Sequence, residues 1–311
     1  MRSRTGVAAS VVTPAQAGVH SGVGKTVARW AGLFKLRIGF VIGFTALAGL
    51  AVTPGSALEG WRIAALGLAV VLSAAAAGGF NQWYERDLDA QMRRTRSRPF
   101  VTGELARDAR WLWLLSAITL ASVMLAGLAT NWLAAAHTFL GAFVYAVVYT
   151  VWLKRRTWWN IVIGGLAGSF AVLAGAAAVA PGVPPAVPLV LAVVLFLWTP
   201  PHFWSLAIAC REDYEAARVP MLPVVVGDRA CARTILGHTV ALAALALVPL
   251  ALGMGWIYGI GAAIGGALFV FTSLRLAANP TRKAALTNFF ASLAQLTLLL
   301  TAAIVDSALA G

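Results

Sequence analysis

Residues 61–89 read WRIAALGLAVVLSAAAAGGFNQWYERDLD, an apolar run that ends in a cluster of polar and charged side chains. The apolar part, 61–80, has about the 20 residues that a helix needs to cross the hydrocarbon core of a bilayer. The polar part, 81–89, follows it directly. We therefore expect a membrane-spanning helix that carries acidic side chains to one surface of the bilayer.

The composition of the whole chain places it in a membrane. Of its 311 residues, 60% are hydrophobic and 11% are charged, and the mean hydropathy is +0.82. A soluble protein of this size needs more polar surface. We expect an all-α polytopic membrane protein with nine transmembrane helices bundled around a central cavity. The predicted spans are residues 36–53, 61–80, 111–130, 132–153, 160–180, 186–209, 233–252, 256–274 and 287–305.

The basic residues predict the orientation of these spans. In this arrangement 23 of the 24 Lys and Arg residues fall in the N-terminal tail or in the loops on its side, and only Arg62 falls on the other side. Excess Lys and Arg mark cytoplasmic segments. We therefore expect a cytoplasmic N-terminus and a C-terminus on the opposite side.

The N-terminal residues 1–30 are basic, hold no acidic residue and lack the apolar run of a secretory signal. We expect a disordered basic tail, followed by a single intramembrane domain over residues 31–311. Orientation in the membrane accounts for the net charge of +13, so we expect no nucleic-acid partner. Cys210 and Cys231 lack the number and spacing of a zinc site, which favours structural thiols.

The end of the second span gathers oxygen ligands on one helical face. Four-residue steps rotate a helix by only about 40°, so Asn81, Glu85 and Asp89 stack along one side. Oxygen ligands of this kind suit Mg²⁺ that also holds phosphates, whereas the alternative is a solvated loop with incidental acids. The planar guanidinium group of each nearby arginine can bind two phosphate oxygens at once. The sequence thus predicts a Mg²⁺-dependent diphosphate site that includes Arg86, Arg94 and Arg98.

A second acidic cluster follows the sixth span on the same side of the membrane. Residues 211–215 read Arg-Glu-Asp-Tyr-Glu and are expected to face the first loop. Two carboxylate clusters can hold Mg²⁺ ions around one diphosphate and assist its departure. The loop after the fourth span adds Lys154, preceded by Tyr145 and Tyr149 on one helical face. The alternatives are a solvated loop and, for Lys154, an interfacial position beside a tyrosine belt.

These loops together resemble the intramembrane prenyltransferase superfamily. Its first signature has the form Asn-x-x-x-Asp/Glu-x-x-hydrophobic-Asp, followed by Arg-Ser/Thr-x-x-Arg-Pro. Within the superfamily the chain is most similar to the protohaem IX farnesyltransferases (haem O synthases), through residues 149–160, 198–204 and 213–223. The likeness covers residues 30–305. The signature is met here by Asn81, Glu85, Leu88, Asp89, Arg94, Thr95, Arg98 and Pro99.

Two positions depart from the family pattern. Leu36 stands where the family usually has Pro between basic residues, and Arg218 stands where it usually has Gly before Val-Pro-Met. Arg218 leaves the detailed geometry of the second loop open, while its charge suits a phosphate.

The resemblance implies a Mg²⁺-dependent enzyme that transfers a farnesyl group from farnesyl diphosphate to a vinyl group of protohaem IX, with addition of water. The product, haem O, precedes haem A, so haem A synthase is an expected partner besides the lipid bilayer. The short tail favours the inner membrane of a bacterium, with the mitochondrial inner membrane as the alternative. The implied catalytic residues and metal ligands are Asn81, Glu85, Asp89 and Asp213. The implied diphosphate ligands are Arg86, Arg94, Arg98, Lys154 and Arg211.

A further group of residues is expected near the haem or the prenyl chain. His202 follows Pro200 and Pro201, which are expected to interrupt the sixth span. An ionisable side chain in a membrane helix is a functional candidate, so His202 either ligates haem iron or positions a propionate. The alternative is a histidine that is hydrogen-bonded within the bundle. Aromatic faces for a farnesyl cation are expected from Tyr145, Tyr149, Phe203 and Trp204.

Other functions fit parts of the sequence. An aromatic prenyltransferase of the quinone or chlorophyll pathway shares the first signature, but residues 199–204 argue against it. A transporter should place ionisable groups near mid-membrane, whereas the acids here gather at one interface. A passive assembly factor needs neither acidic cluster.

Overall fold

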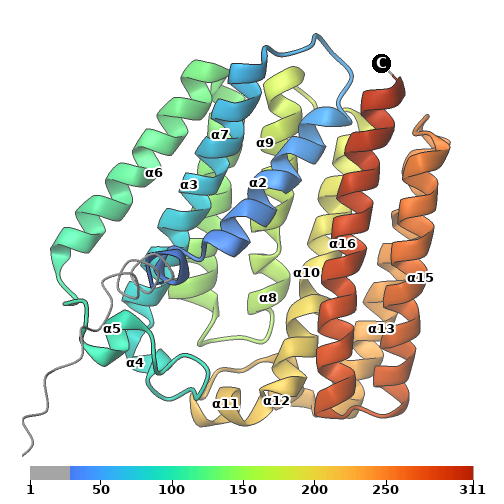
Figure 1. The fold of residues 1–311 in the computed structure, drawn as a ribbon. Helices are drawn as coiled ribbons and strands as arrows, with labels where there is room; N and C mark the ends of the chain where they lie inside the picture. The colour runs from blue at the N-terminus through green and yellow to red at the C-terminus, as the bar shows by residue number, and fades with distance from the viewer. Residues whose placement is uncertain (1–28, 311) are drawn as a thin grey trace, which may run out of the picture.

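The computed structural model describes residues 29–310 and consists of helices packed side by side (Figure 1). No strand occurs among the residues that it describes. The predicted all-α class is confirmed. The predicted disordered tail lies outside the described residues, apart from its last two positions, which are helical, so the prediction is wrong for these two.

Each predicted span coincides with one helix or with two consecutive helices. Eight such segments within residues 29–310 are long and apolar enough to cross a membrane. The remaining one, α2, has 16 residues. It is about 24 Å long against a hydrocarbon core of about 30 Å, so the count of nine crossings stays a prediction. The segments are α2 (Leu36–Ala51), α3 (Gly60–Tyr84), α6 (Ala109–Ala129), α7 (Trp132–Phe143) with η1 (Val144–Leu153), α8 (Asn160–Gly164) with α9 (Leu166–Val179), α10 (Ala186–Ala209), α13 (Asp228–Leu245) with α14 (Val248–Ala251), α15 (Trp256–Ala278) and α16 (Arg282–Ala310).

The expected interruption of the sixth span does not occur. Pro200 and Pro201 lie inside α10, which runs as one helix to Ala209. Proline is tolerated in membrane helices when neighbouring groups and local adjustments satisfy the freed backbone. In the following turn the Ser205 hydroxyl donates to the Pro201 carbonyl at 2.6 Å.

The short helices of the two acidic loops gather at one end of the bundle. Figure 1 shows α4 (Arg86–Asp89) and α5 (Pro99–Thr102) at the same end as α11 (Arg211–Ala216) and α12 (Leu222–Val226). The C-terminal end of α16 lies at the opposite end (Figure 1). The predicted placement of both loops on one side is therefore confirmed, whereas the assignment of that side to the cytoplasm stays a prediction.

Helices α2 and α9 approach each other closely through glycines. A methyl group on Gly175 of α9 would lie 1.8 Å from the Ala46 carbonyl oxygen, and one on Gly49 would lie 2.2 Å from the Val172 carbonyl oxygen. Small residues allow this close backbone contact where lipid supplies no hydrophobic drive between helices. The backbones of α2 and α9 are therefore in direct contact.

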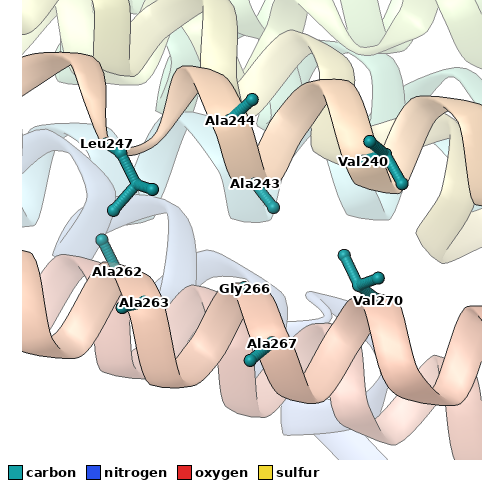
Figure 2. A pocket seen from close by; sticks show the side chains of 9 residues that line it. All are labelled: Val240, Ala243, Ala244, Leu247, Ala262, Ala263, Gly266, Ala267 and Val270. Atoms are coloured by element: carbon teal, nitrogen blue, oxygen red, sulfur yellow. The ribbon is translucent and has the colours of Figure 1, made fainter.

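An apolar groove of about 410 Å³ lies between α13 and α15 (Figure 2). It carries no charged side chain, so it does not suit a diphosphate. Its lining residues are Val240, Ala243, Ala244, Leu247, Ala262, Ala263, Gly266, Ala267 and Val270.

Candidate active site

The end of α3 presents three oxygen-bearing side chains on one buried face. The helical hydrogen bonds continue past Tyr84, because the Glu85 amide donates to the Asn81 carbonyl at 2.9 Å and the Asp89 amide to the Glu85 carbonyl at 2.8 Å. Asn81, Glu85 and Asp89 are 2%, 1% and 1% exposed. The predicted stacking of these residues is therefore confirmed, and the face points into the protein.

Each of these side chains is paired with a different basic residue. The Lys35 ammonium donates to Asn81 Oδ1 at 2.6 Å. Lys154 Nζ lies 2.5 Å from Glu85 Oε2, and a guanidinium nitrogen of Arg98 lies 2.6 Å from Asp89 Oδ2. Carboxylates are stable in a low-dielectric site only when they are paired and hydrogen-bonded in this way. The face of α3 therefore carries three amide or carboxylate groups and three cations side by side.

A π-helix brings Lys154 and a tyrosine to this face. In an α-helix with 3.6 residues per turn, Lys154 lies two and a half turns from Tyr145 and points the opposite way. Residues Val144–Leu153 instead form η1, whose i→i+5 hydrogen bonds widen each turn. The Lys154 amide donates to the Tyr149 carbonyl at 2.9 Å, and the Thr150 hydroxyl to the Tyr145 carbonyl at 2.8 Å. The wider turn places Tyr145, Thr150 and Lys154 on one side.

The side chains on this side of η1 contact the end of α3. The Tyr145 hydroxyl accepts from Lys35 Nζ at 2.9 Å, and the Thr150 hydroxyl accepts from Asn81 Nδ2 at 3.0 Å. The Tyr145 and Tyr149 rings stack with centroids 5.7 Å apart, as their predicted common face requires. Sequence reasoning missed Lys35 and Thr150 as site residues. The sequence feature that could have identified Lys35 is its position with Arg37 at the start of the first predicted span.

The two acidic loops face each other through an arginine that the sequence did not single out. The Arg93 guanidinium pairs with the Glu212 carboxylate and lies 3.4 Å from Asp213 Oδ1. Arg93 and Glu212 are mostly exposed, whereas the side chain of Asp213 is 14% exposed. The expected approach of the two loops is therefore confirmed, and it places Asp213 next to the ion pair of Arg93 and Glu212.

The other predicted diphosphate ligands differ in their surroundings. Arg86 and Arg94 are exposed. Burial raises the pKa of the Tyr214 phenol in the opposite loop, and the nearby charge of Arg94 opposes this shift. Arg211 pairs with Glu215 at 2.6 Å and with Asp228 at 3.4 Å. Its guanidinium is thus held by acids that follow it in the chain, and its diphosphate role stays a prediction.

Arg218 closes α11 in the left-handed backbone region. Its φ is 52°. The Val219 amide donates to the Tyr214 carbonyl at 2.9 Å and the Arg218 amide to the Glu215 carbonyl at 3.0 Å. These two bonds form a Schellman motif, in which glycine is the preferred left-handed residue. The geometry therefore explains why the related family has Gly here, and it shows that Arg218 keeps the turn.

The positive charges of the site affect one another. Burial, followed by the nearby charge of Arg98, lowers the pKa of Lys35 to about 7, and the Glu85 carboxylate opposes this shift. Cations that repel each other at a buried site favour a ligand with several negative charges. A diphosphate is a ligand of that kind.

The oxygen donors fit Mg²⁺, although the acids do not form a cluster that is ready for a metal. Glu85 Oε1 is buried without a hydrogen-bond partner, which leaves one carboxylate oxygen for a cation. Within residues 29–310, however, no three His, Cys, Asp or Glu side chains lie close enough to hold a metal ion. The predicted ligand set of Asn81, Glu85, Asp89 and Asp213 is therefore not preassembled, because each acid is held by its own cation. Mg²⁺ binds through one or two carboxylates together with substrate phosphates, which suits this arrangement.

His202 lies in an aromatic stack between α10 and α16. Its ring stacks on Trp198 with centroids 4.3 Å apart and on Phe289 with centroids 4.4 Å apart. Its Nδ1 lies 2.7 Å from the Ser292 hydroxyl. Ser292 is the kind of partner expected if His202 is hydrogen-bonded within the bundle. A role of His202 at the haem therefore stays a prediction. Trp204 is 1% exposed, its ring edge meets His238, and its indole N–H is buried without a partner.

Solved structures of low sequence identity share the fold. One described as digeranylgeranylglyceryl phosphate synthase aligns with a TM-score of 0.73 at 17% identity, over 91% of this chain and 99% of that chain. A UbiA homologue from Archaeoglobus fulgidus bound to GPP and Mg²⁺ aligns with a TM-score of 0.63 at 20% identity, over 89% and 99% of the two chains.

Curated relatives are far more similar in sequence. Protoheme IX farnesyltransferase 2 of Paramagnetospirillum magneticum is 56% identical over 281 residues, which are 90% of this chain and 97% of the relative. Protoheme IX farnesyltransferase 1 of the same organism is 47% identical over 88% of this chain and 96% of the relative. The model of the UbiA prenyltransferase family matches residues 42–294. The chain therefore belongs to the UbiA prenyltransferase family, among the protohaem IX farnesyltransferases.

Proposed function

We propose that this chain transfers the farnesyl group of farnesyl diphosphate to a vinyl group of protohaem IX, with addition of water, and so forms haem O. Its family and the names of its relatives support the reaction class and the acceptor. The structural observation that supports it best is the buried face of Asn81, Glu85 and Asp89, each beside a basic side chain. A diphosphate with its metal needs oxygen ligands for the cation and cations for the phosphates.

The diphosphate is proposed to lie between the end of α3 and the second loop. Asn81, Glu85, Asp89 and Asp213 would hold Mg²⁺, which neutralises the leaving diphosphate when it is bound. Arg98 and Lys154 already lie at this face, and they can pass their hydrogen bonds to phosphate oxygens. Three further arginines would take the outer phosphate: Arg86 and Arg94, which are exposed, and Arg211, which is partly buried.

The chemistry then needs charge stabilisation, and it needs water to be kept from the farnesyl cation until the new carbon–carbon bond has formed. The bond between farnesyl C1 and the diphosphate oxygen breaks, and its electron pair leaves with the diphosphate. The vinyl group supplies the electron pair of the new carbon–carbon bond. Water adds to the resulting haem cation and releases one proton. The stacked rings of Tyr145 and Tyr149, next to the site, offer π-faces to the farnesyl cation.

The surroundings of the enzyme follow from the same proposal. His202 would ligate the haem iron or position a propionate. Trp204, which meets His238 on a different face of α10, is proposed to lie near the haem or the prenyl chain. The chain is a multi-pass membrane protein whose named relatives are bacterial, and we propose the inner membrane as its location. Haem O is the substrate of a subsequent oxidation, so a haem A synthase is the proposed recipient of the product.

The test is a product assay with purified protein in detergent, protohaem, farnesyl diphosphate and Mg²⁺. Asp89→Asn should lose haem O formation by about 10²-fold or more, as expected for loss of a group that stabilises transition-state charge. Asp87→Asn is the matched control, because the Asp87 side chain is 71% exposed on the same short helix and should retain activity. EDTA should abolish the activity of the wild type, and added Mg²⁺ should restore it.

The opposite outcomes identify what is wrong. An active preparation that leaves haem unchanged, but releases diphosphate with a quinone or chlorin precursor, would replace the acceptor. Equal activity of Asp89→Asn and wild type would show that Asp89 and its face at the end of α3 do not take part in the reaction.

A further inference from the structure

Asn81, Glu85 and Asp89, the three oxygen donors at the end of α3, each contact a different basic side chain. Lys35 comes from the turn before α2, Lys154 from the end of η1, and Arg98 from the loop that precedes α5. Three separate parts of the chain therefore each deliver one positive charge to one donor. The side chains of Lys154 and Arg98 are 11% and 20% exposed, so these contacts are largely shielded from water.

Each of these cations occupies an oxygen that the proposed metal would need. Asn81 Oδ1 accepts from Lys35, while its amide nitrogen is held by Thr150, so the whole amide is oriented by the pair. Glu85 gives one oxygen to Lys154, and Asp89 gives one to Arg98. A divalent cation that arrives alone would find Glu85 Oε1 without a partner, but Asn81 Oδ1, Glu85 Oε2 and Asp89 Oδ2 already taken, and it would meet the repulsion of three positive charges.

We propose that Lys35, Lys154 and Arg98 are exchangeable counter-ions that make metal binding conditional on the diphosphate. This inference rests on the proposed function. When the diphosphate enters, the three cations transfer their hydrogen bonds to its oxygens and release Asn81, Glu85 and Asp89 for the metal. The metal alone binds weakly, the diphosphate alone binds weakly, and each tightens the other.

Lys35 is the residue at which this exchange is easiest to measure. It donates to two neutral groups, Asn81 Oδ1 and the Tyr145 hydroxyl, and to no carboxylate that its removal would leave unpaired. Lys154 and Arg98, by contrast, each neutralise a buried acid. Replacing Lys35 therefore removes one positive charge from the metal site without creating a buried lone carboxylate.

The sign of the expected effects follows from linkage. If a cation opposes the metal and assists the diphosphate, its removal tightens the metal and weakens the diphosphate. The coupling is reciprocal, so the factor by which pyrophosphate tightens the metal equals the factor by which the metal tightens pyrophosphate. Removal of Lys35 must lower that single factor.

The experiment measures Mn²⁺ binding to the full-length protein in detergent by electron paramagnetic resonance, at buffered free Mn²⁺, with and without inorganic pyrophosphate. We expect pyrophosphate to tighten Mn²⁺ binding to the wild type by roughly 10-fold or more, within the usual range of coupling. Lys35→Met should bind Mn²⁺ alone several-fold more tightly than the wild type, and pyrophosphate should add little. Lys35→Arg should restore the coupling.

The matched control is Lys283→Met, which removes the same charge from an exposed position at the start of α16. It should bind Mn²⁺ as the wild type does. If Lys35→Met does not fold, Lys35→Gln takes its place. The proposal is overturned if Lys35→Met and Lys283→Met bind Mn²⁺ alike, or if pyrophosphate does not tighten Mn²⁺ binding to the wild type.

The assay of haem O separates this inference from the proposed function. If the wild type makes haem O in a Mg²⁺-dependent reaction but shows no coupling between Mn²⁺ and pyrophosphate, the exchange is wrong and the function stands. If the folded wild type makes no haem O and binds neither Mn²⁺ nor pyrophosphate, the proposed function and the proposed exchange are both wrong.

Discussion

The ammonium of Lys154 lies 2.5 Å from Oε2 of Glu85, although the two residues are 69 positions apart in the chain. The Glu85 side chain is 1% exposed and that of Lys154 is 11% exposed, and the contact depends on the π-helical turn that ends at Leu153. It joins the end of α3 to η1 and places a cation beside the predicted metal face. A buried pair of this kind contributes little net stability but is costly to break from one side.

The pairing of Lys154 with Glu85 predicts that the effects of substituting the two residues on the free energy of unfolding are not additive in a double-mutant cycle. Lys154→Met and Glu85→Gln should each lower the free energy of unfolding by about 3–5 kcal/mol, because each leaves a buried polar group without its partner. The double variant should recover most of that loss while remaining inactive. Denaturant unfolding in detergent measures the four free energies.

Arg110→Met serves as the control for this cycle, since Arg110 pairs with Asp108 at 2.7 Å but its side chain is 88% exposed. It should leave stability almost unchanged. Additive losses in the double variant would show that Lys154 and Glu85 do not form the pair seen here.

The contact between the two loops predicts rescue by charge exchange. Arg93→Glu should repel Glu212 and Asp213 and separate the loops, so kcat/KM for farnesyl diphosphate should fall several-fold while the unfolding temperature changes little. Adding Glu212→Arg should restore most of the activity, because the pair is re-formed with reversed charges. Steady-state kinetics at low salt test it, and failure of the rescue would mean that Arg93 acts in another way.

The left-handed turn at Arg218 predicts a stabilising substitution. A residue with a Cβ atom at φ 52° is strained relative to glycine, so Arg218→Gly should raise the free energy of unfolding by about 1 kcal/mol. The neighbouring Ala217 has a φ of −85°, and Ala217→Gly should instead lower it by about 1 kcal/mol. A loss of stability in Arg218→Gly would show that contacts of the arginine outweigh the backbone strain.

The close contact of α9 with α2 predicts that an alanine at Gly175 destabilises the protein, whereas an alanine at a glycine without neighbours does not. Gly175→Ala should destabilise the protein by about 3 kcal/mol, because the new methyl group would meet backbone atoms of Ala46 and Leu50. Gly237 of α13 has no atom within 4 Å of the position of an added Cβ, so Gly237→Ala should be stabilising by about 0.5–1 kcal/mol. Thermal unfolding in detergent compares them, and similar values for both variants would contradict this packing.

Much of the fold could be predicted because lipid imposes simple rules on sequence. Long apolar runs must form helices whose backbone groups are satisfied internally, and residues at four-residue spacing must share a face. The spans and the common face of Asn81, Glu85 and Asp89 followed from these rules. The prediction of a break at Pro200 and Pro201 failed, because composition does not show which neighbouring groups will accommodate a proline.

The site was predicted less completely, because its pairs join distant parts of the chain. The sequence identified Lys154 and Arg98 as basic residues near a phosphate, but nothing in it showed that Lys35 reaches Asn81 or that Arg93 reaches Asp213. The π-helix was also invisible, since η1 has the apolar composition of an ordinary membrane helix.

The amino-acid sequence by itself determined the helical class, the side on which the acids gather and the family of the chain, because these depend on composition, spacing and local motifs. Only the tertiary structure decided which cation meets which oxygen. Those contacts depend on the turn width of η1 and on the close approach of helices, and both are set by packing between residues far apart in the chain.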